Sequence, residues 1–305
     1  MIVGALIFVL TMTALGWNFA ALAPEKFEAV TYEINEDFDD IRISVDVSDV
    51  RILPSEDGRA SAISYESERI KHELSVKDGV LTVSASDERS WIHGIGFNFD
   101  SPRITLYLPE EAYGKLTVNG HTGDVEIASG FTFSSIDATL TTASLSCLSD
   151  AGSISLQAST GDLHLSGVAA ESVSLKVTTG DISASNVSVT RGLVVSVSTG
   201  DARLTDVECG SFLSSGSTGD IALTRLLCSG KLVCERSTGD VLFDHSDAAE
   251  ISVTTTTGDV TGTLLSTKYF IVKLSTGSKR VPESTEGGFC EITVSTGNLF
   301  IDIAE

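Results

Sequence analysis

Seven aspartates recur at a nearly constant spacing along the chain, and a row of carboxylates is the arrangement that most readily suggests chemistry. Each follows a glycine: Asp124, Asp162, Asp181, Asp201, Asp220, Asp240 and Asp259. The six from Asp162 onward are candidate ligands for a row of Ca²⁺ ions, because Ca²⁺ prefers oxygen ligands. Since Ca²⁺ takes about six to eight oxygens and each repeat offers one carboxylate, we favour the alternative, in which each Asp accepts N–H groups of its turn.

A threonine precedes each of the ten aligned corner positions. These are Thr122, Thr142, Thr160, Thr179, Thr199, Thr218, Thr238, Thr257, Thr276 and Thr296. Flat threonine arrays bind ice in some solenoids. Apolar residues alternate along the segment before each glycine, and continuing this alternation places the threonine inside. Its hydroxyl would then hydrogen-bond to neighbouring repeats, so we favour a structural role over ice binding.

The five cysteines include no C-x-x-C pair, which argues against a disulfide framework or a zinc site. Cys209 and Cys228 both lie nine residues after their glycine, so their side chains should stack in successive repeats. This spacing fits either a disulfide or a pair of small buried side chains.

Enzyme motifs find little support in the sequence. The five histidines have no metal-ligand spacing, and neither a nucleophile elbow nor a phosphate-binding loop is present. The sequence therefore predicts no catalysis and no cofactor. The alternative is a polysaccharide lyase or hydrolase, in which acidic residues line one face of a solenoid.

An aromatic, glycine-punctuated stretch runs from Trp91 to Phe99 in a chain that is only 7% aromatic. Trp91, Ile95, Phe97 and Phe99 are its candidate partner-binding residues, because exposed apolar patches usually mark interfaces. A packed crossover between strands explains the same residues equally well.

The element that positions all these columns is a repeat of about 19 to 20 residues, aligned on glycines from Gly123 to Gly297. Apolar residues alternate before each glycine and resume two residues after it, so each repeat contains two short strands and two corners. Stacked at about 4.8 Å, such repeats form a β-solenoid with an apolar lumen. We predict about ten rungs over residues 113–305, closed at the far edge by the charges of Asp302 and Glu305.

Residues 25–112 follow a different pattern. Alternating runs and the Asp78-Gly79 turn predict an antiparallel β cap, and the segment from Val45 to Ile52 resembles a repeat without its glycine. A cap is expected because an open end would template association with other strands.

Residues 1–24 carry no charged side chain, and the apolar run from Ile2 to Ala23 is long enough to cross a membrane as a helix. Ala21-Leu22-Ala23 resembles a signal cleavage site, but Pro24 would follow the cut. We favour an uncleaved transmembrane anchor. The net charge of −22 belongs to the rest of the chain and argues against nucleic acid as a partner.

The repeated Ser-Thr-Gly-Asp segments behind an apolar N-terminus resemble the bacterial β-strand-repeat “putative adhesin” family, also called toastrack-like domains. This resemblance covers roughly residues 27–305 and implies an extracytoplasmic domain on a single-pass anchor in the bacterial cell membrane. It supplies no catalytic residues. We therefore expect a non-catalytic interaction or envelope-sensing scaffold that contacts an envelope polymer, another membrane protein or further copies of itself.

Overall fold

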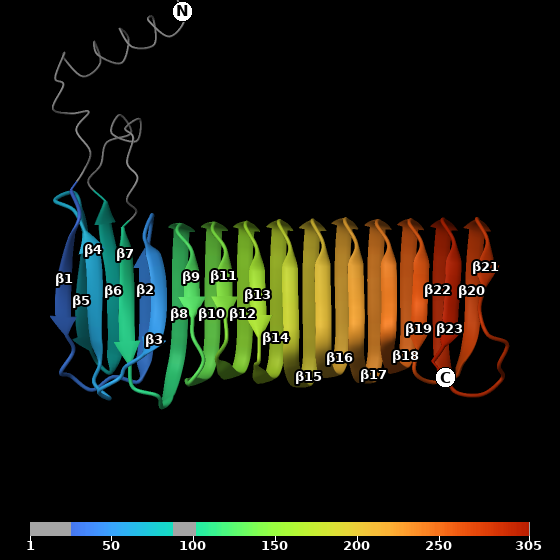
Figure 1. The fold of residues 1–305 in the computed structure, drawn as a ribbon, viewed down its shortest axis with the longest axis horizontal. Helices are drawn as coiled ribbons and strands as arrows, with labels where there is room; N and C mark the ends of the chain where they lie inside the picture. Colours follow the sequence, from blue (N-terminus) through green and yellow to red (C-terminus); the bar gives the residue numbers. More distant parts are fainter. Residues whose placement is uncertain (1–25, 88–101, 305) are drawn as a thin grey trace, which may run out of the picture.

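The computed structural model describes residues 26–87 and 102–304. They form an all-β solenoid of about nine turns, and no helix occurs among them. Figure 1 shows the rungs stacked in one row, with the N-terminal strands at one end and the C-terminal strands at the other. The transmembrane helix predicted near the N-terminus lies outside the described residues. Within the described ranges, no helix has the length and apolar character needed to cross a membrane.

The N-terminal region contains seven strands. They are β1 (Glu28–Glu33), β2 (Asp40–Val45), β3 (Asp49–Pro54), β4 (Ser61–Glu66), β5 (Ile70–Lys77), β6 (Val80–Asp87) and β7 (Arg103–Leu108). β2 and β3 each run parallel to a solenoid strand, so the segment recognised as a repeat without its glycine does form a rung. β6 and β7 stack on its other side. Antiparallel β5, β4 and β1 then close this end, and Asp78-Gly79 makes the β5–β6 turn.

The solenoid contains the remaining sixteen strands. The first eight are β8 (Ala112–Thr122), β9 (Val125–Ile127), β10 (Thr132–Thr142), β11 (Leu145–Cys147), β12 (Asp150–Thr160), β13 (Leu163–Ser166), β14 (Ala169–Thr179) and β15 (Ile182–Thr199). The others are β16 (Ala202–Thr218), β17 (Ile221–Thr238), β18 (Val241–Thr257), β19 (Val260–Leu264), β20 (Lys268–Thr276), β21 (Lys279–Arg280), β22 (Gly288–Thr296) and β23 (Leu299–Ile303).

Neighbouring rungs are parallel and in register, so residues of one repeat position stack as a column. Val173, Leu175 and Val177 of β14, for example, are buried and align with Leu193, Val195 and Val197 of β15. Such columns form one continuous hydrophobic core along the solenoid. The two-residue alternation predicted from the sequence is therefore the pattern that fills the lumen.

Glycine is required at the corner for two reasons. Gly180 has φ 137°, a conformation that side chains rarely adopt, and a Cβ there would collide with the carbonyl oxygen of Gly161 in the preceding rung. Ala143, the degenerate copy, does not have a positive φ, and its side chain is buried. The corner thus tolerates alanine only where the local backbone differs.

The order of the last two rungs is reversed relative to the sequence. β22 pairs with both β18 and β20, so β22 lies between them and β20 forms the end of the stack. Cys290, Ile292 and Val294 of β22 are accordingly buried, whereas the inward residues of β20 are only half-buried.

The prediction that the charge of Asp302 closes the far edge is therefore wrong. Asp302 lies on β23, which pairs with β19 on one side and with β21 on the other. Glu305 lies outside the described residues. The physical reason is that the chain passes over one vacant position and later returns to fill it, and repeat spacing alone does not encode that order.

Candidate functional site

The aspartate column forms a hydrogen-bond ladder. Oδ1 of Asp162 accepts the backbone N–H of Asp181 at 2.8 Å, and Oδ1 of Asp181 accepts that of Asp201 at 2.8 Å. The same contact repeats through Asp220, Asp240 and Asp259. The preferred reading, in which each Asp accepts N–H groups at its corner, matches this geometry, although the N–H belongs to the next rung.

The ladder continues where the motif lacks aspartate. Oγ of Ser144 accepts the N–H of Asp162 at 3.2 Å, and Oδ1 of Asn298 accepts that of Ser278 at 3.1 Å. At the other end Asp49 accepts the N–H of Asp124 at 2.9 Å. Uncharged oxygens can therefore occupy the column, so the corner requires an acceptor oxygen.

Calcium has no cage at this column. Each carboxylate commits one oxygen to a backbone N–H, and Arg203 Nη2 holds Oδ2 of Asp201 at 2.6 Å. Across residues 26–87 and 102–304, no group of three or more His, Cys, Asp or Glu side chains is arranged to hold a metal ion.

The threonine column faces outward, so the prediction that it lies inside is wrong. All ten threonines and the residues immediately before them are exposed. The alternation of inward and outward residues breaks at the corner, and the break begins at the threonine itself. There the Thr179 carbonyl oxygen accepts the N–H of Gly161 at 3.0 Å, and comparable backbone bonds recur along the stack. The backbone carbonyl, not the side-chain hydroxyl, thus links the rungs.

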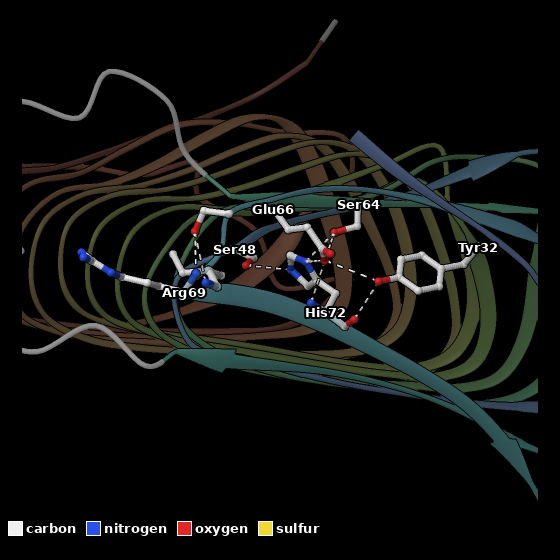
Figure 2. Close-up of polar contacts among 8 residues, drawn as sticks. Tyr32, Ser48, Ser64, Glu66, Arg69 and His72 are labelled. Carbon is white, nitrogen blue, oxygen red and sulfur yellow. Dashed lines mark hydrogen bonds and ion pairs between the residues drawn. The ribbon is translucent and has the colours of Figure 1, made fainter. Parts of the chain in front are cut away.

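A buried polar cluster joins the cap to the first rung (Figure 2). His72 Nε2 lies 2.9 Å from Ser48 Oγ, and its Nδ1 lies 2.7 Å from Ser64 Oγ. Oε2 of Glu66 accepts the Ser64 hydroxyl at 2.9 Å and the backbone N–H of His72 at 2.9 Å. Tyr32 donates its hydroxyl to the His72 carbonyl oxygen at 3.0 Å.

This order of groups resembles a serine–histidine–carboxylate relay, but its setting suits a structural role. The Ser48 and Ser64 residues have 0% exposure, so the nucleophile position is enclosed by the fold. Burial lowers the pKa of His72, which keeps the imidazole neutral and able to bridge both hydroxyls. His72 lies two residues after buried Ile70 in an alternating strand, so its position in the sequence indicated that its side chain faces inward.

A groove of about 750 Å³ runs across the rungs, and the two cysteines that the sequence predicts to stack line it. Cys209 and Cys228 are paired positions on β16 and β17, as their spacing predicted, and both are free thiols. At the end of the groove, Lys268 Nζ lies 2.5 Å from Asp247 Oδ1 and donates to the Ala248 carbonyl oxygen at 2.7 Å. The groove therefore combines a thiol pair with an ion pair that is nearly buried.

Exposed apolar side chains lie at the C-terminal end of the stack. Those on the paired strands β20 and β22, which we call the distal patch, are Tyr269, Ile271 and Phe289. Phe300 is also exposed but lies on β23, beyond the corner. Phe289 is 57% exposed, and its ring packs edge-on against Tyr269 with 5.7 Å between centroids. The guanidinium of Arg280 lies 6.0 Å from the centre of the Phe300 ring. These aromatic residues occupy outward positions of their alternating strands, and this was the signal in the sequence that they are exposed.

The other predicted partner-binding residues, Trp91, Ile95, Phe97 and Phe99, lie outside the described residues. Of the sequence-predicted sites, the fold brings together the Asp column and the thiol pair. The distal patch, the cap cluster and the Lys268–Asp247 pair are additions from the tertiary structure.

Comparison with known proteins identifies the repeat architecture. The family model described as Toastrack DUF4097 matches residues 38–264. A structure named “putative adhesin” from Bacteroides fragilis is 16% identical, covers 78% of this chain and 96% of its own, and has a TM-score of 0.45. One with the same name from Parabacteroides merdae is 13% identical, covers 92% and 97%, and has a TM-score of 0.48. A search of curated proteins found no match.

Proposed function

This chain belongs to the Toastrack DUF4097 family, and on that premise we propose that it is a non-catalytic interaction scaffold held at a bacterial membrane by its N-terminal segment. The solenoid projects outside the cell and presents its distal patch to an envelope protein. The observation that carries this proposal is the placement of exposed apolar side chains. Among the described residues, nine of the ten exposed large hydrophobic side chains lie at or beyond Val194, in the half of the stack remote from the cap.

The composition of the distal patch favours a protein partner. Aromatic side chains are enriched in protein interfaces, and contiguous exposed apolar surface usually marks one. Tyr269 and Phe289 add a ridge that a partner pocket can enclose. A polypeptide surface is therefore the occupant that these side chains fit.

The free edge of β20 defines the shape of that partner. β20 pairs with β22 on one side, and no strand among the described residues covers its other edge. An extended segment can add to such an edge through main-chain hydrogen bonds. The basic side chains nearby are already paired: Lys268 with Asp247, Lys273 with Glu291 and Arg280 with Asp302. The partner that fits this edge is an extended segment of an envelope protein.

Site-specific photo-crosslinking in the native membrane tests this assignment. We place a photoreactive amino acid at position 289 of the full chain and, as the matched control, at Ile63, which is similarly apolar and 39% exposed on β4. Position 289 should give one discrete protein adduct that position 63 does not give. Tyr269→Ser in the same chain should weaken that adduct severalfold, because it removes half of the aromatic ridge.

The adduct itself distinguishes the occupants. Its partner, identified by peptide mass, should be an envelope protein with an extended segment, and deleting that segment should remove the adduct. Equal labelling from positions 63 and 289 would contradict a specific site. An adduct of twice the chain mass would assign the edge to a second copy, and one shortened by glycosidases would assign it to a polymer.

A further inference from the structure

Two of the five cysteines lie where a small solute can reach them. Cys209 and Cys228 are each 5% exposed, and both line the groove across the rungs. The residues that follow them, Gly210 and Ser229, are small and line the same groove, so no bulky side chain covers the pair from there. The cysteines with 0% exposure are Cys147, Cys234 and Cys290. The groove therefore distinguishes one pair of thiols from the other three.

The fold places the two sulfurs opposite each other across adjacent strands. Cys209 and Cys228 are paired positions on parallel β16 and β17, and a hydrogen bond links their thiols. Neighbouring rungs are about 4.8 Å apart, and the Cβ atoms of one column are separated by a similar distance. A disulfide prefers Cβ atoms about 3.8 Å apart, so it would have to draw the two strands together.

An ion held between the two sulfurs fits this spacing better. With metal–sulfur bonds of about 2.3 Å, the length found for zinc thiolates, an ion in line with two sulfurs needs them about 4.6 Å apart. This distance is close to the separation of the rungs, so the strands need not move. The in-register pairing of β16 and β17 therefore sets the sulfurs at the distance that a bridging ion requires.

The absence of further donors from the column selects the class of ion. The paired positions on either side of the thiols are Val189 on β15 and Ala248 on β18, whose side chains carry no donor atom. Zinc sites and iron–sulfur clusters usually take four protein ligands. Thiolates are soft ligands that favour Cu(I), and two of them in a line satisfy this closed-shell monovalent ion.

We infer that Cys209 and Cys228 form a binding site for a single Cu(I) ion. One copper–sulfur bond forms to each side chain, each thiol releases its proton to solvent, and the oxidation state of the metal does not change. The groove admits the ion, and the paired strands hold the sulfurs in place. This site is separate from the distal patch and does not depend on the proposed function.

Competition with bicinchoninate, a chelator that is coloured when it holds Cu(I), tests the site. The reduced full chain is studied in detergent without oxygen, and wild type should withdraw one Cu(I) per chain. Cys228→Ala should weaken this uptake at least about a hundredfold, because it removes one of two ligands. Cys147→Ala is the matched control, since it removes a buried thiol outside the groove, and it should take up Cu(I) as wild type does.

Thiol protection and X-ray absorption supply two further measurements. One equivalent of Cu(I) should shield Cys209 and Cys228 from iodoacetamide, and the bound copper should show two sulfur neighbours. If Cys228→Ala fails to fold, Cys209→Val replaces it, because valine already occupies the paired position on β15.

Several results would overturn the inference. They are no uptake by wild type, unaltered uptake in Cys228→Ala, and an equal loss in Cys147→Ala. Zn²⁺ bound as tightly as Cu(I), or copper with four neighbours, would also overturn it, because either would require ligands beyond the two thiols.

Discussion

At the corner column, each rung requires one acceptor oxygen from the side chain that follows the glycine. Asp162 and Asp181 supply it as carboxylates, Ser144 as a hydroxyl and Asn298 as an amide. Stacked carboxylates about 4.8 Å apart repel one another by roughly 1 kcal/mol in water. Each bond to a backbone N–H offsets that repulsion, which explains why the column tolerates so many like charges.

Two substitutions of Asp240 distinguish its role as a hydrogen-bond acceptor from the effect of its charge. Asp240→Ala removes the acceptor of the Asp259 N–H and should lower the free energy of unfolding by about 1 kcal/mol. Asp240→Asn keeps an acceptor oxygen and should stay within about 0.5 kcal/mol of wild type. Chemical denaturation measures both. Equal losses in the two variants would show that the charge, and so a bound cation, is what the column needs.

His72 should make the cap sensitive to acid. Burial lowers its pKa in the folded chain, whereas the unfolded chain has the ordinary value of about 6.5. The unfolded state therefore binds more protons between the folded pKa and about 6.5, and stability falls as the pH drops through that window. Denaturation at pH 7.5 and 5.5 should show a larger loss for wild type than for His72→Gln. Parallel losses would assign the effect to other groups.

Cys228 should be the more reactive thiol of its pair. A hydrogen bond from Cys209, with help from the backbone N–H groups of Gly230 and Phe212, lowers the pKa of Cys228, while that of Cys209 is raised. Iodoacetamide should therefore modify Cys228 first, and Cys209→Ala should shift the pH midpoint of that modification upward.

Mass analysis of the unreduced chain distinguishes the two alternatives that the sequence leaves open for Cys209 and Cys228, a disulfide or a pair of buried thiols. A loss of two hydrogens would show a disulfide between Cys209 and Cys228. Modification of Cys228 no faster than that of buried Cys147, whose pKa is raised to about 11 by burial, would contradict the predicted reactivity.

At the scale of elements, the reversed order of the last rungs depends on a clamp. Lys268 begins β20, its paired position on β22 is Gly288, and its ammonium reaches Asp247 and the Ala248 carbonyl oxygen on β18. The lysine side chain thus crosses the inserted rung at the position where that rung has no side chain. It ties the end of the stack to the third rung from that end.

Breaking the clamp should loosen the end of the solenoid. Lys268→Ala leaves Asp247 nearly buried without its partner, which typically costs about 3 kcal/mol. Hydrogen exchange should then speed up in β20 and β22 and remain unchanged in β12. Lys273→Ala is the control on the same strand, because its ion pair with Glu291 is exposed and should matter little. Equal protection in both variants would show that packing alone holds the end.

For the whole molecule, the two ends of the stack differ in kind. Antiparallel β5, β4 and β1 close the N-terminal end, whereas β20 closes the other with a free edge and half-buried side chains. The matched family region ends at residue 264, before β20 begins. The free end and its distal patch therefore lie on the part of the chain that follows the matched repeats.

Removal of residues 1–24 tests how the molecule is held. The apolar run should keep the full chain in the membrane fraction, and deletion should move the solenoid to the soluble fraction, since about 22 uncharged residues suffice to span a bilayer. The intact mass of the membrane form should include Met1. A mature chain that begins after Ala23 would instead identify these residues as a cleaved signal.

The sequence by itself determined the β-solenoid, its corner glycines, the Asp column and the stacking of Cys209 on Cys228. These depend on a spacing of 19 to 20 residues and on alternation within a strand, both of which are local. The resemblance to the toastrack family rested on the same motif and is confirmed by the matched family model.

Only the tertiary structure decided the features that depend on contacts between rungs. Lys268 and Gly288 acquire meaning as a pair across adjacent strands, and His72 needs Ser48 from another layer to be satisfied. The threonines face outward because their carbonyl oxygens, which no side-chain pattern reports, make the corner bonds. The place of β22 between β18 and β20 follows from which edge is free when the chain returns, and repeat spacing carries no record of that order.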